Sequence, residues 1–153
     1  MTRSFTALLL ALIIDVDQQG DYVYKLTEDQ RQWIFSDAIR YLHTETDATG
    51  WSEEFGWAHA IAHGADLLLF TGLHSAFPKE RMPQILEAIL KVLHQQTAVF
   101  SAGEEKRLAR VLVQLLYLRN YQKTSSAIGY KIATFQMKQH KSTTPISTLK
   151  TCS

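Results

Sequence analysis

Apolar side chains recur every three or four residues along most of this chain, and this spacing limits the possible folds more than any other feature. Such a period places the apolar side chains on one face of an α-helix, whereas a half-buried β-strand would alternate at every second residue. Each face of this kind has to pack against another helix, so the sequence predicts an all-α domain. The clearest stripes are Ile85, Leu86, Ile89, Leu90 and Leu93, and then Leu108, Val111, Leu112, Leu115 and Leu116.

Capping residues and prolines divide the chain into separate helices. Thr27 and Gln30 form a capping box that begins a helix, and Ser101 and Glu104 have the same spacing. Pro83 fits only in the first turn of a helix. Residues 45–55 carry turn-forming side chains without a period, so they are expected to form a long loop. The expected helices cover residues 1–14, 28–44, 54–70 and 80–96, a stretch that begins at the second capping box, and residues 125–139.

The first expected helix needs separate treatment, because its apolar run resembles a secretory signal. The run covers only residues 7–14 and is followed at once by Asp15 and Asp17, without a signal-peptidase cleavage pattern. A membrane-spanning helix needs about 20 apolar residues. We therefore interpret this segment as a core helix.

The helices are expected to form one domain over residues 1–140, followed by a frayed tail over residues 141–153, where few side chains repay the entropy of ordering. The helix pairs 28–70 and 80–119 are similar in length, and their apolar stripes are offset by roughly fifty residues. This repeat-like spacing favours a HEAT-like α-α superhelix of antiparallel helix pairs. A helical bundle is the alternative.

Charge and cysteine content exclude several classes of protein. Lysine and arginine number 16 and aspartate and glutamate 15, so the chain lacks the basic balance of a nucleic-acid-binding protein. The single cysteine, Cys152, allows neither an internal disulfide nor a cysteine-based metal cluster. We therefore expect a cytoplasmic protein that binds neither nucleic acid nor membrane.

Three polar residues stand out in the otherwise apolar segment 57–70, which reads WAHAIAHGADLLLF. On a continuous helix, spacings of four and three would place His59, His63 and Asp66 in one narrow sector, opposite Trp57 and Ile61. Because the rest of this helix is apolar, the three polar groups are expected to be buried or to line a groove, where each needs a partner.

This polar stripe has three interpretations. In the first it is a structural hydrogen-bond network, in which the histidines and Asp66 bond to each other, to neighbouring backbone or to Arg107, with Arg107 to Asp66 as the first expected pairing. In the second, His59, His63 and Asp66 bind a divalent metal ion such as zinc. In the third they form a small-ligand or acid–base pocket, in which Asp66 holds His63 so that it titrates near neutral pH.

Two separated motifs resemble those of an uncharacterised bacterial family of unknown function. Residues 55–66 read FGWAHAIAHGAD and residues 100–108 read FSAGEEKRL, and the family patterns are GWxHxxAHxAD and GE[DE]xRL. The resemblance covers roughly residues 8–118. It implies an α-α superhelical fold. Members of the family carry further helices before the counterpart of Leu8, and without them the first helix of this chain would expose an apolar face. The counterparts of the family motifs are Gly56, Trp57, His59, His63, Asp66, Gly103, Glu104 and Arg107.

The second motif also has two interpretations. Glu104 and Glu105 in a first helical turn are favourable beside the positive end of the helix dipole, or else Glu104 or Arg107 reaches across to the polar stripe. Trp51, in the long loop, either anchors that loop or closes over a pocket. The remaining histidines have no matched acids in the sequence and are expected to be solvated. They are His43, His74, His94 and His140.

The sequence as a whole favours an interaction or scaffold domain that binds an unknown protein partner, has no cofactor and is not an enzyme. In this interpretation the stripe is structural. The alternative is a metal-dependent or acid–base enzyme, or a small-ligand binder, centred on His59, His63 and Asp66.

Overall fold

The computed structural model describes residues 2–20, 25–54, 56–96 and 99–123. Within these residues lie the helices α1 (Thr2–Gln19), α2 (Glu28–Thr44), α3 (Ala60–Leu73), α4 (Met82–Gln95) and α5 (Glu104–Lys123). A short antiparallel hairpin, made of β1 (Trp51–Ser52) and β2 (Gly56–Trp57), connects α2 to α3. The 3-10 turn η1 (Lys79–Arg81) precedes α4. The predicted all-α class is confirmed, with this hairpin as an addition.

The chain divides into two compact units, Met1–Leu115 and Leu116–Ser153. The first unit contains α1 to α4, the hairpin and the N-terminal part of α5, and every contact discussed below lies within it. Of the second unit, the structure describes residues 116–123, which end α5. The expected helix over residues 125–139, the domain end at residue 140 and the tail over residues 141–153 lie outside the described residues and stay predictions.

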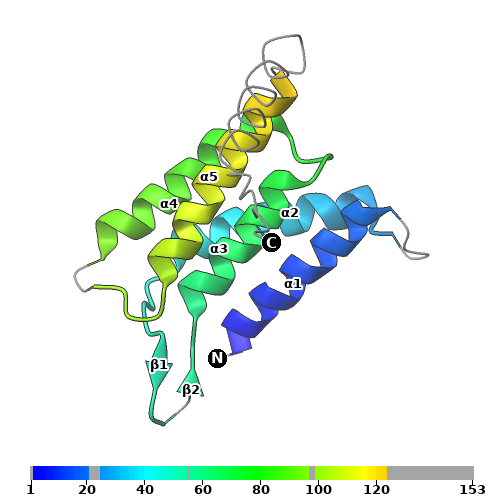
Figure 1. Ribbon diagram of the computed structural model, residues 1–153. Helices are drawn as coiled ribbons and strands as arrows, with labels where there is room; N and C mark the ends of the chain where they lie inside the picture. Colours follow the sequence, from blue (N-terminus) through cyan, green and yellow to red (C-terminus); the bar gives the residue numbers. More distant parts are fainter. Residues whose placement is uncertain (1, 21–24, 55, 97–98, 124–153) are drawn as a thin grey trace, which may run out of the picture. The chain divides into compact units, whose positions relative to one another are not determined.

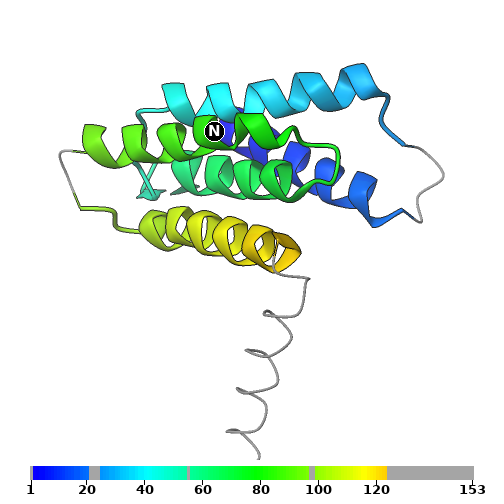
Figure 2. The ribbon, with the colours of Figure 1, turned by 90° about the horizontal axis from the view of Figure 1, so that it is seen from above.

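Helices α1 to α4 form two layers, because helices that are not consecutive lie side by side. Helix α1 packs against α3 and α2 packs against α4, while contacts between α2 and α3 join the two layers (Figure 1). Successive helices run in opposite directions, which Figure 2 shows from above. The HEAT-like superhelix itself stays a prediction.

Helix α3 is the centre of the core. Its side chains are apolar at nearly every position, and most of them are buried, among them Ile61, Leu67 and Leu68. Phe35 and Leu42 of α2, Ile85 and Ile89 of α4 and Leu108 of α5 belong to the same cluster. Within the described residues, none of the helices is both long enough and apolar enough to cross a membrane.

Several predicted helix boundaries are confirmed. Helix α2 has the predicted bounds, and both bonds of its capping box are present, since the Thr27 side chain accepts from the Gln30 backbone and the Gln30 side chain accepts from the Thr27 backbone. Pro83 lies in the first turn of α4, where its missing N–H costs nothing.

The predicted helix over residues 54–70 is wrong at its beginning, because α3 starts only at Ala60. The backbone N–H groups of Ala58 and His59 donate to the carbonyl oxygens of Gly50 and Thr49 and so extend the hairpin ladder. Gly56 and His59 have φ values of 72° and 49°, which cannot continue a right-handed helix. The long loop expected over residues 45–55 accordingly contains β1.

The predicted capping box at Ser101 and Glu104 is also wrong. Helix α5 begins at Glu104 itself, so Ser101 is too far upstream to be its N-cap. Gly103 precedes the helix with a φ of 83°, and its carbonyl oxygen accepts from the backbone N–H of Arg107. This conformation favours glycine, since an L side chain adopts it only with strain.

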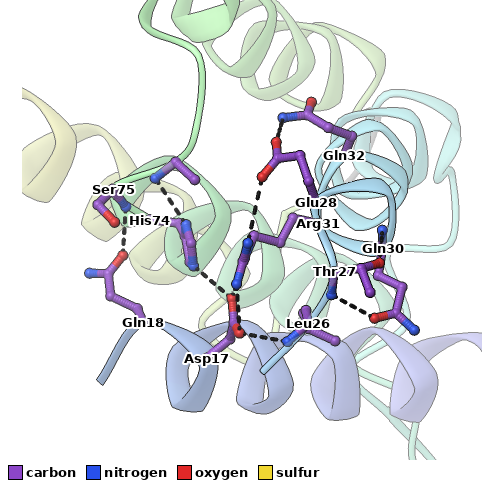
Figure 3. A network of polar contacts seen from close by, with 11 residues as sticks. Asp17, Gln18, Leu26, Thr27, Glu28, Gln30, Arg31, Gln32, His74 and Ser75 are labelled. Carbon is purple, nitrogen blue, oxygen red and sulfur yellow. Dashed lines mark hydrogen bonds and ion pairs between the residues drawn. The ribbon is translucent and has the colours of Figure 1, made fainter. Parts of the chain in front are cut away.

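A buried carboxylate, Asp17, ties the C-terminal half of α1 to α2 and to the end of α3 (Figure 3). The guanidinium Nε of Arg31 lies 2.6 Å from Asp17 Oδ2, and His74 Nε2 lies 3.1 Å from the same oxygen. The backbone N–H of Leu26 donates to Asp17 Oδ1 over 2.9 Å. His74 was expected to be solvated. That prediction is wrong, because its side chain is only 4% exposed.

The hydrogen bonds of this cluster define its charges. The backbone N–H of Ala76 donates to His74 Nδ1, so in the neutral ring the proton sits on Nε2 and is donated to Asp17. Burial lowers the pKa of His74 and favours this neutral form. The bond from Arg31 lowers the pKa of Asp17 to about 2. Asp17 and Arg31 therefore form the ion pair, and neutral His74 donates a further hydrogen bond to the carboxylate.

Replacing Asp17 with Asn should lower the free energy of unfolding by about 2 kcal/mol, because Arg31 loses its buried counter-charge while retaining partial access to water and to Glu28. Urea denaturation measures this difference. Asp15→Asn is the matched control, since Asp15 accepts a hydrogen bond from Gln19 in an exposed pair. Equal losses in the two variants would contradict the structural role of Asp17.

Candidate functional site

Five rings from three parts of the chain form a continuous line, which we call the aromatic ledge: Phe5, His63, His59, Trp57 and Trp51. The centroids of neighbouring rings in this line are 5.5, 5.6, 4.6 and 4.9 Å apart. Phe5 belongs to α1, His63 to α3, and both tryptophans to the hairpin. The ledge therefore joins segments that are far apart in the sequence.

The large rings of the ledge are open to solvent. Phe5, Trp51 and Trp57 are 50%, 55% and 51% exposed. Trp57 was expected on a buried helix face opposite the histidines, and this is wrong, because Trp57 lies in β2 and stacks on His59 with only 8° between the ring planes. Trp51 packs edge-on against Trp57. Neighbouring exposed aromatic rings are unusual on a soluble protein and mark candidate binding surfaces.

The apolar surface continues from the ledge along α1. Phe5, Leu9 and Leu12 follow each other at spacings of four and three and are each at least half exposed. The opposite side of α1 packs on α3 through Ala7, Ala11 and Ile14. The expectation that the first helix exposes an apolar face is confirmed by these exposures.

His59 holds a strained position at the centre of the ledge. Among the described residues it is the single non-glycine with a positive φ, in the left-handed region at φ 49° and ψ 33°. A left-handed residue with a side chain costs roughly 1–2 kcal/mol. Its N–H bonds to Thr49 and its carbonyl oxygen accepts from His63, so both neighbouring segments hold the conformation. Strain of this kind is typical of functional sites.

Glu104 lies directly behind His59. Its side chain is 1% exposed, and Oε1 lies 3.6 Å from His59 Nδ1. Both of these atoms are buried, and within the described part of the chain neither has a hydrogen-bond partner. The other oxygen, Oε2, accepts from the backbone N–H of Ala102 over 3.0 Å. The prediction that Glu104 reaches the polar stripe is confirmed for His59, and Glu104 does more than face the helix dipole.

This geometry selects a tautomer for His59. A proton on Nδ1 points at the buried carboxylate oxygen, whereas a lone pair there would face a negative charge. In the neutral ring, Nε2 is then a hydrogen-bond acceptor. Because Nδ1 is buried and the side chain is 23% exposed, the accessible part of His59 is the remainder of the ring. With Nδ1 facing the buried carboxylate, Nε2 is the ring nitrogen of His59 that a ligand can reach.

His63 is held differently, by a serine of α1. His63 Nδ1 lies 2.7 Å from Ser4 Oγ, and the Ser4 hydroxyl donates to the carbonyl oxygen of Ala58. Since the hydroxyl proton is used on Ala58, His63 donates to Ser4 and does not accept from it. Ser4 is thus fixed as a structural group and is not activated as a nucleophile.

Asp66 accepts a hydrogen bond from Arg107, so the predicted Asp66–Arg107 pair is confirmed. The pair links α3 to α5. It also occupies the carboxylate that was expected to hold His63, and the hypothesis of a His63–Asp66 acid–base pair stays a prediction without geometric support. The three residues do not lie on one continuous helix as predicted, because His59 precedes α3, but the His59 ring still lies 5.6 Å from that of His63.

In the ranges that the structure describes, no group of three or more His, Cys, Asp or Glu side chains is arranged to hold a metal ion. A structural zinc site needs four ligands and a catalytic site needs three. The divalent metal predicted for His59, His63 and Asp66 gains no support from the positions of these donors.

Gly50 contributes to the site although the sequence did not single it out. A Cβ at this position would overlap the side chain of Ala102 and lie 3.2 Å from Glu104 Oε1. The close approach of the hairpin strand to the segment before α5 therefore needs glycine. The motif residue Gly56 has a positive φ of 72° in β2, directly before Trp57, whose ring stacks on that of His59.

These observations define the class of protein: a two-layer helical domain with an inserted hairpin and an aromatic, histidine-containing ledge. The chain belongs to a family described as "Protein of unknown function (DUF2785)", whose family model matches residues 1–149. No curated protein and no solved structure matches the chain. The resemblance to a family of unknown function is thereby confirmed.

The free energy of unfolding should fall as the pH is lowered from about 7.5 to about 5. Burial, with the nearby His59 as a second cause, lowers the pKa of His63 below its ordinary 6.5. Below pH 6.5 the unfolded chain therefore binds protons that the folded chain does not, and the stability present above that pH is lost. His74 contributes with the same sign.

Denaturation at a series of pH values checks this. His63→Asn, whose amide can replace the donor at Nδ1, should reduce the pH dependence, whereas His94→Asn on the exposed side of α4 should not change it. A wild type whose stability is constant over this range, or a variant of His63 with the same pH dependence, would contradict the assignment.

Proposed function

We propose that this domain binds a segment of a partner protein on the aromatic ledge. The observation that supports the proposal most is the line of neighbouring rings in which Phe5, Trp51 and Trp57 are each at least half exposed. Aromatic side chains dominate the energetics of protein interfaces, because they bury a large area and lose little conformational entropy on binding.

The apolar stripe of α1 supports the same function. Leu9 and Leu12 continue the exposed surface from Phe5 along the helix, and together they offer a partner more apolar area than an isolated exposed side chain would. A partner segment that lies on the ledge and along this stripe would remove both from water. The energy of binding would come mainly from that burial.

An enzymatic function has less support. The hydroxyl of Ser4 is used structurally, and the carboxylate of Asp66 is paired with Arg107. The His59–Glu104 pair is suited to positioning a proton, but a general base also needs a reacting group within reach. For these reasons we treat the domain as a binding module without a cofactor.

Two finer features belong to this proposal. We propose a HEAT-like arrangement of the helix pairs, supported by the side-by-side packing of α1 with α3 and of α2 with α4. We also propose a cytoplasmic location, supported by the single cysteine, Cys152, and by the absence of a membrane-spanning helix among the described residues.

Selection of displayed random peptides against the wild-type protein tests the function. Peptides enriched by the wild type should lose about tenfold or more in affinity for Trp57→Ala, because a central aromatic anchor is removed. The matched control is Trp33→Ala, since Trp33 of α2 is 58% exposed but lies outside the ledge. Trp33→Ala should bind the enriched peptides with the same affinity as the wild type.

Titration calorimetry measures these affinities, and circular dichroism verifies that both variants are folded. Peptides that bind Trp57→Ala and Phe5→Ala as tightly as the wild type would exclude the ledge as the binding site.

A further inference from the structure

We infer that the partner segment is basic and that one of its lysine or arginine side chains lies against Trp57 and Trp51. This inference rests on the proposed binding function and names the chemistry of the ligand. It depends on three observations: the local charge around the ledge, the pairing of the arginines near it, and the unpartnered carboxylate oxygen of Glu104.

The part of the chain that supplies most of the ledge is strongly acidic, although the chain as a whole is nearly neutral. Between Arg40 and Lys79 there is no lysine or arginine, while this stretch contains Glu45, Asp47, Glu53, Glu54 and Asp66. Glu53 and Glu54 are exposed and follow β1 in the hairpin that carries both tryptophans. The hairpin thus combines exposed aromatic faces with negative charge.

The arginines that adjoin the ledge do not cancel this charge. Arg3 lies 3.3 Å from the buried carboxylate of Glu45, and Arg107 is hydrogen-bonded to Asp66. Each arginine is therefore matched by an acid of its own. The carboxylates of Glu53, Glu54 and Glu104 are left to determine the sign of the local potential.

Glu104 supplies the third observation. Its Oε1 is buried, lacks a hydrogen-bond partner in the described residues and faces His59 Nδ1 at 3.6 Å. With the Nδ1 proton directed at this oxygen, His59 presents Nε2 as an acceptor. An acceptor backed by a buried negative charge favours an N–H donor that carries positive charge.

The tryptophans fit the same ligand. An ammonium or guanidinium group binds over the face of an indole ring, because the ring face is negative. His59 stacks on Trp57 at 4.6 Å, while half of the Trp57 surface stays exposed. The aliphatic part of a lysine or arginine would also cover apolar surface of the ledge. An acidic partner or a nucleic acid would instead be repelled by Glu53 and Glu54.

The test uses four fluorescein-labelled pools of degenerate peptides that differ only in the central residue, which is lysine, arginine, norleucine or glutamate. Fluorescence anisotropy measures their binding to the wild type, Trp57→Ala and Trp33→Ala. For the wild type, the lysine and arginine pools should bind roughly fivefold more tightly than the norleucine pool, and the glutamate pool should bind most weakly. Trp57→Ala should weaken all pools, and Trp33→Ala should not.

Charge variants then show which carboxylates cause the preference for lysine over norleucine. The double variant Glu53→Gln with Glu54→Gln, and separately Glu104→Gln, should each reduce the preference for lysine over norleucine. Glu104→Gln keeps the size of the side chain and an oxygen for the Ala102 N–H. The matched control is Glu80→Gln with Glu87→Gln, which changes the net charge equally at exposed positions in η1 and α4.

The outcomes separate the two proposals. If the norleucine pool binds as tightly as the lysine pool and Trp57→Ala abolishes binding, the inference of a basic partner is overturned and the proposed function stands. If the control variant reduces the lysine preference as much as the hairpin variant does, the preference reflects net charge alone and the inference is again overturned. If no pool binds at about 1 mM, both proposals fail.

Discussion

The burial of α3 is the constraint on which the rest of this structure depends. A helix that is apolar on nearly every side has to be covered by protein, and here α1, α2 and α4 pack against it, while apolar side chains of α5 belong to the same core cluster. Two of its polar side chains have a partner on a neighbouring element, whereas the buried hydroxyl of Thr71 has none among the described residues. Asp66 finds Arg107 of α5, and His63 finds Ser4 of α1. The polar contacts of the site are therefore consequences of covering α3.

The hairpin converts this covered helix into a candidate binding surface. The hairpin ends at His59, which has a left-handed backbone conformation and directly precedes α3. The ring of His59 lies between those of Trp57 and His63. The closeness of Gly50 to Ala102 brings the buried carboxylate of Glu104 behind that ring. Exposed aromatic rings, an oriented imidazole and a buried negative charge meet at one place. This combination is the physical basis for a binding site that selects a cationic side chain.

At the opposite end of α3, the Asp17 cluster has a different role. Its carboxylate is satisfied completely by Arg31, His74 and the Leu26 backbone, so no capacity is left for a ligand. The contrast with Glu104, which keeps a buried oxygen without a partner, separates a structural polar cluster from a candidate site. Both acids are buried, and the difference between them lies in how many of their hydrogen bonds are made.

The sequence by itself determined the helical class and the bounds of α2, because capping and apolar periodicity act between residues close together in the chain. It determined the packing face of α4 only in part, since Leu90 and Leu93 of the predicted stripe are 52% and 41% exposed. It also indicated the Asp66–Arg107 pair through its motifs. The tertiary structure alone decided where α3 begins, because the hairpin bonds of Ala58 and His59 outweigh the helical tendency of residues 54–59. It likewise decided the partner of His74, which lies 57 residues away, and the meeting of Phe5 with His63. Contacts between distant segments depend on how whole helices pack, and local sequence patterns do not encode them.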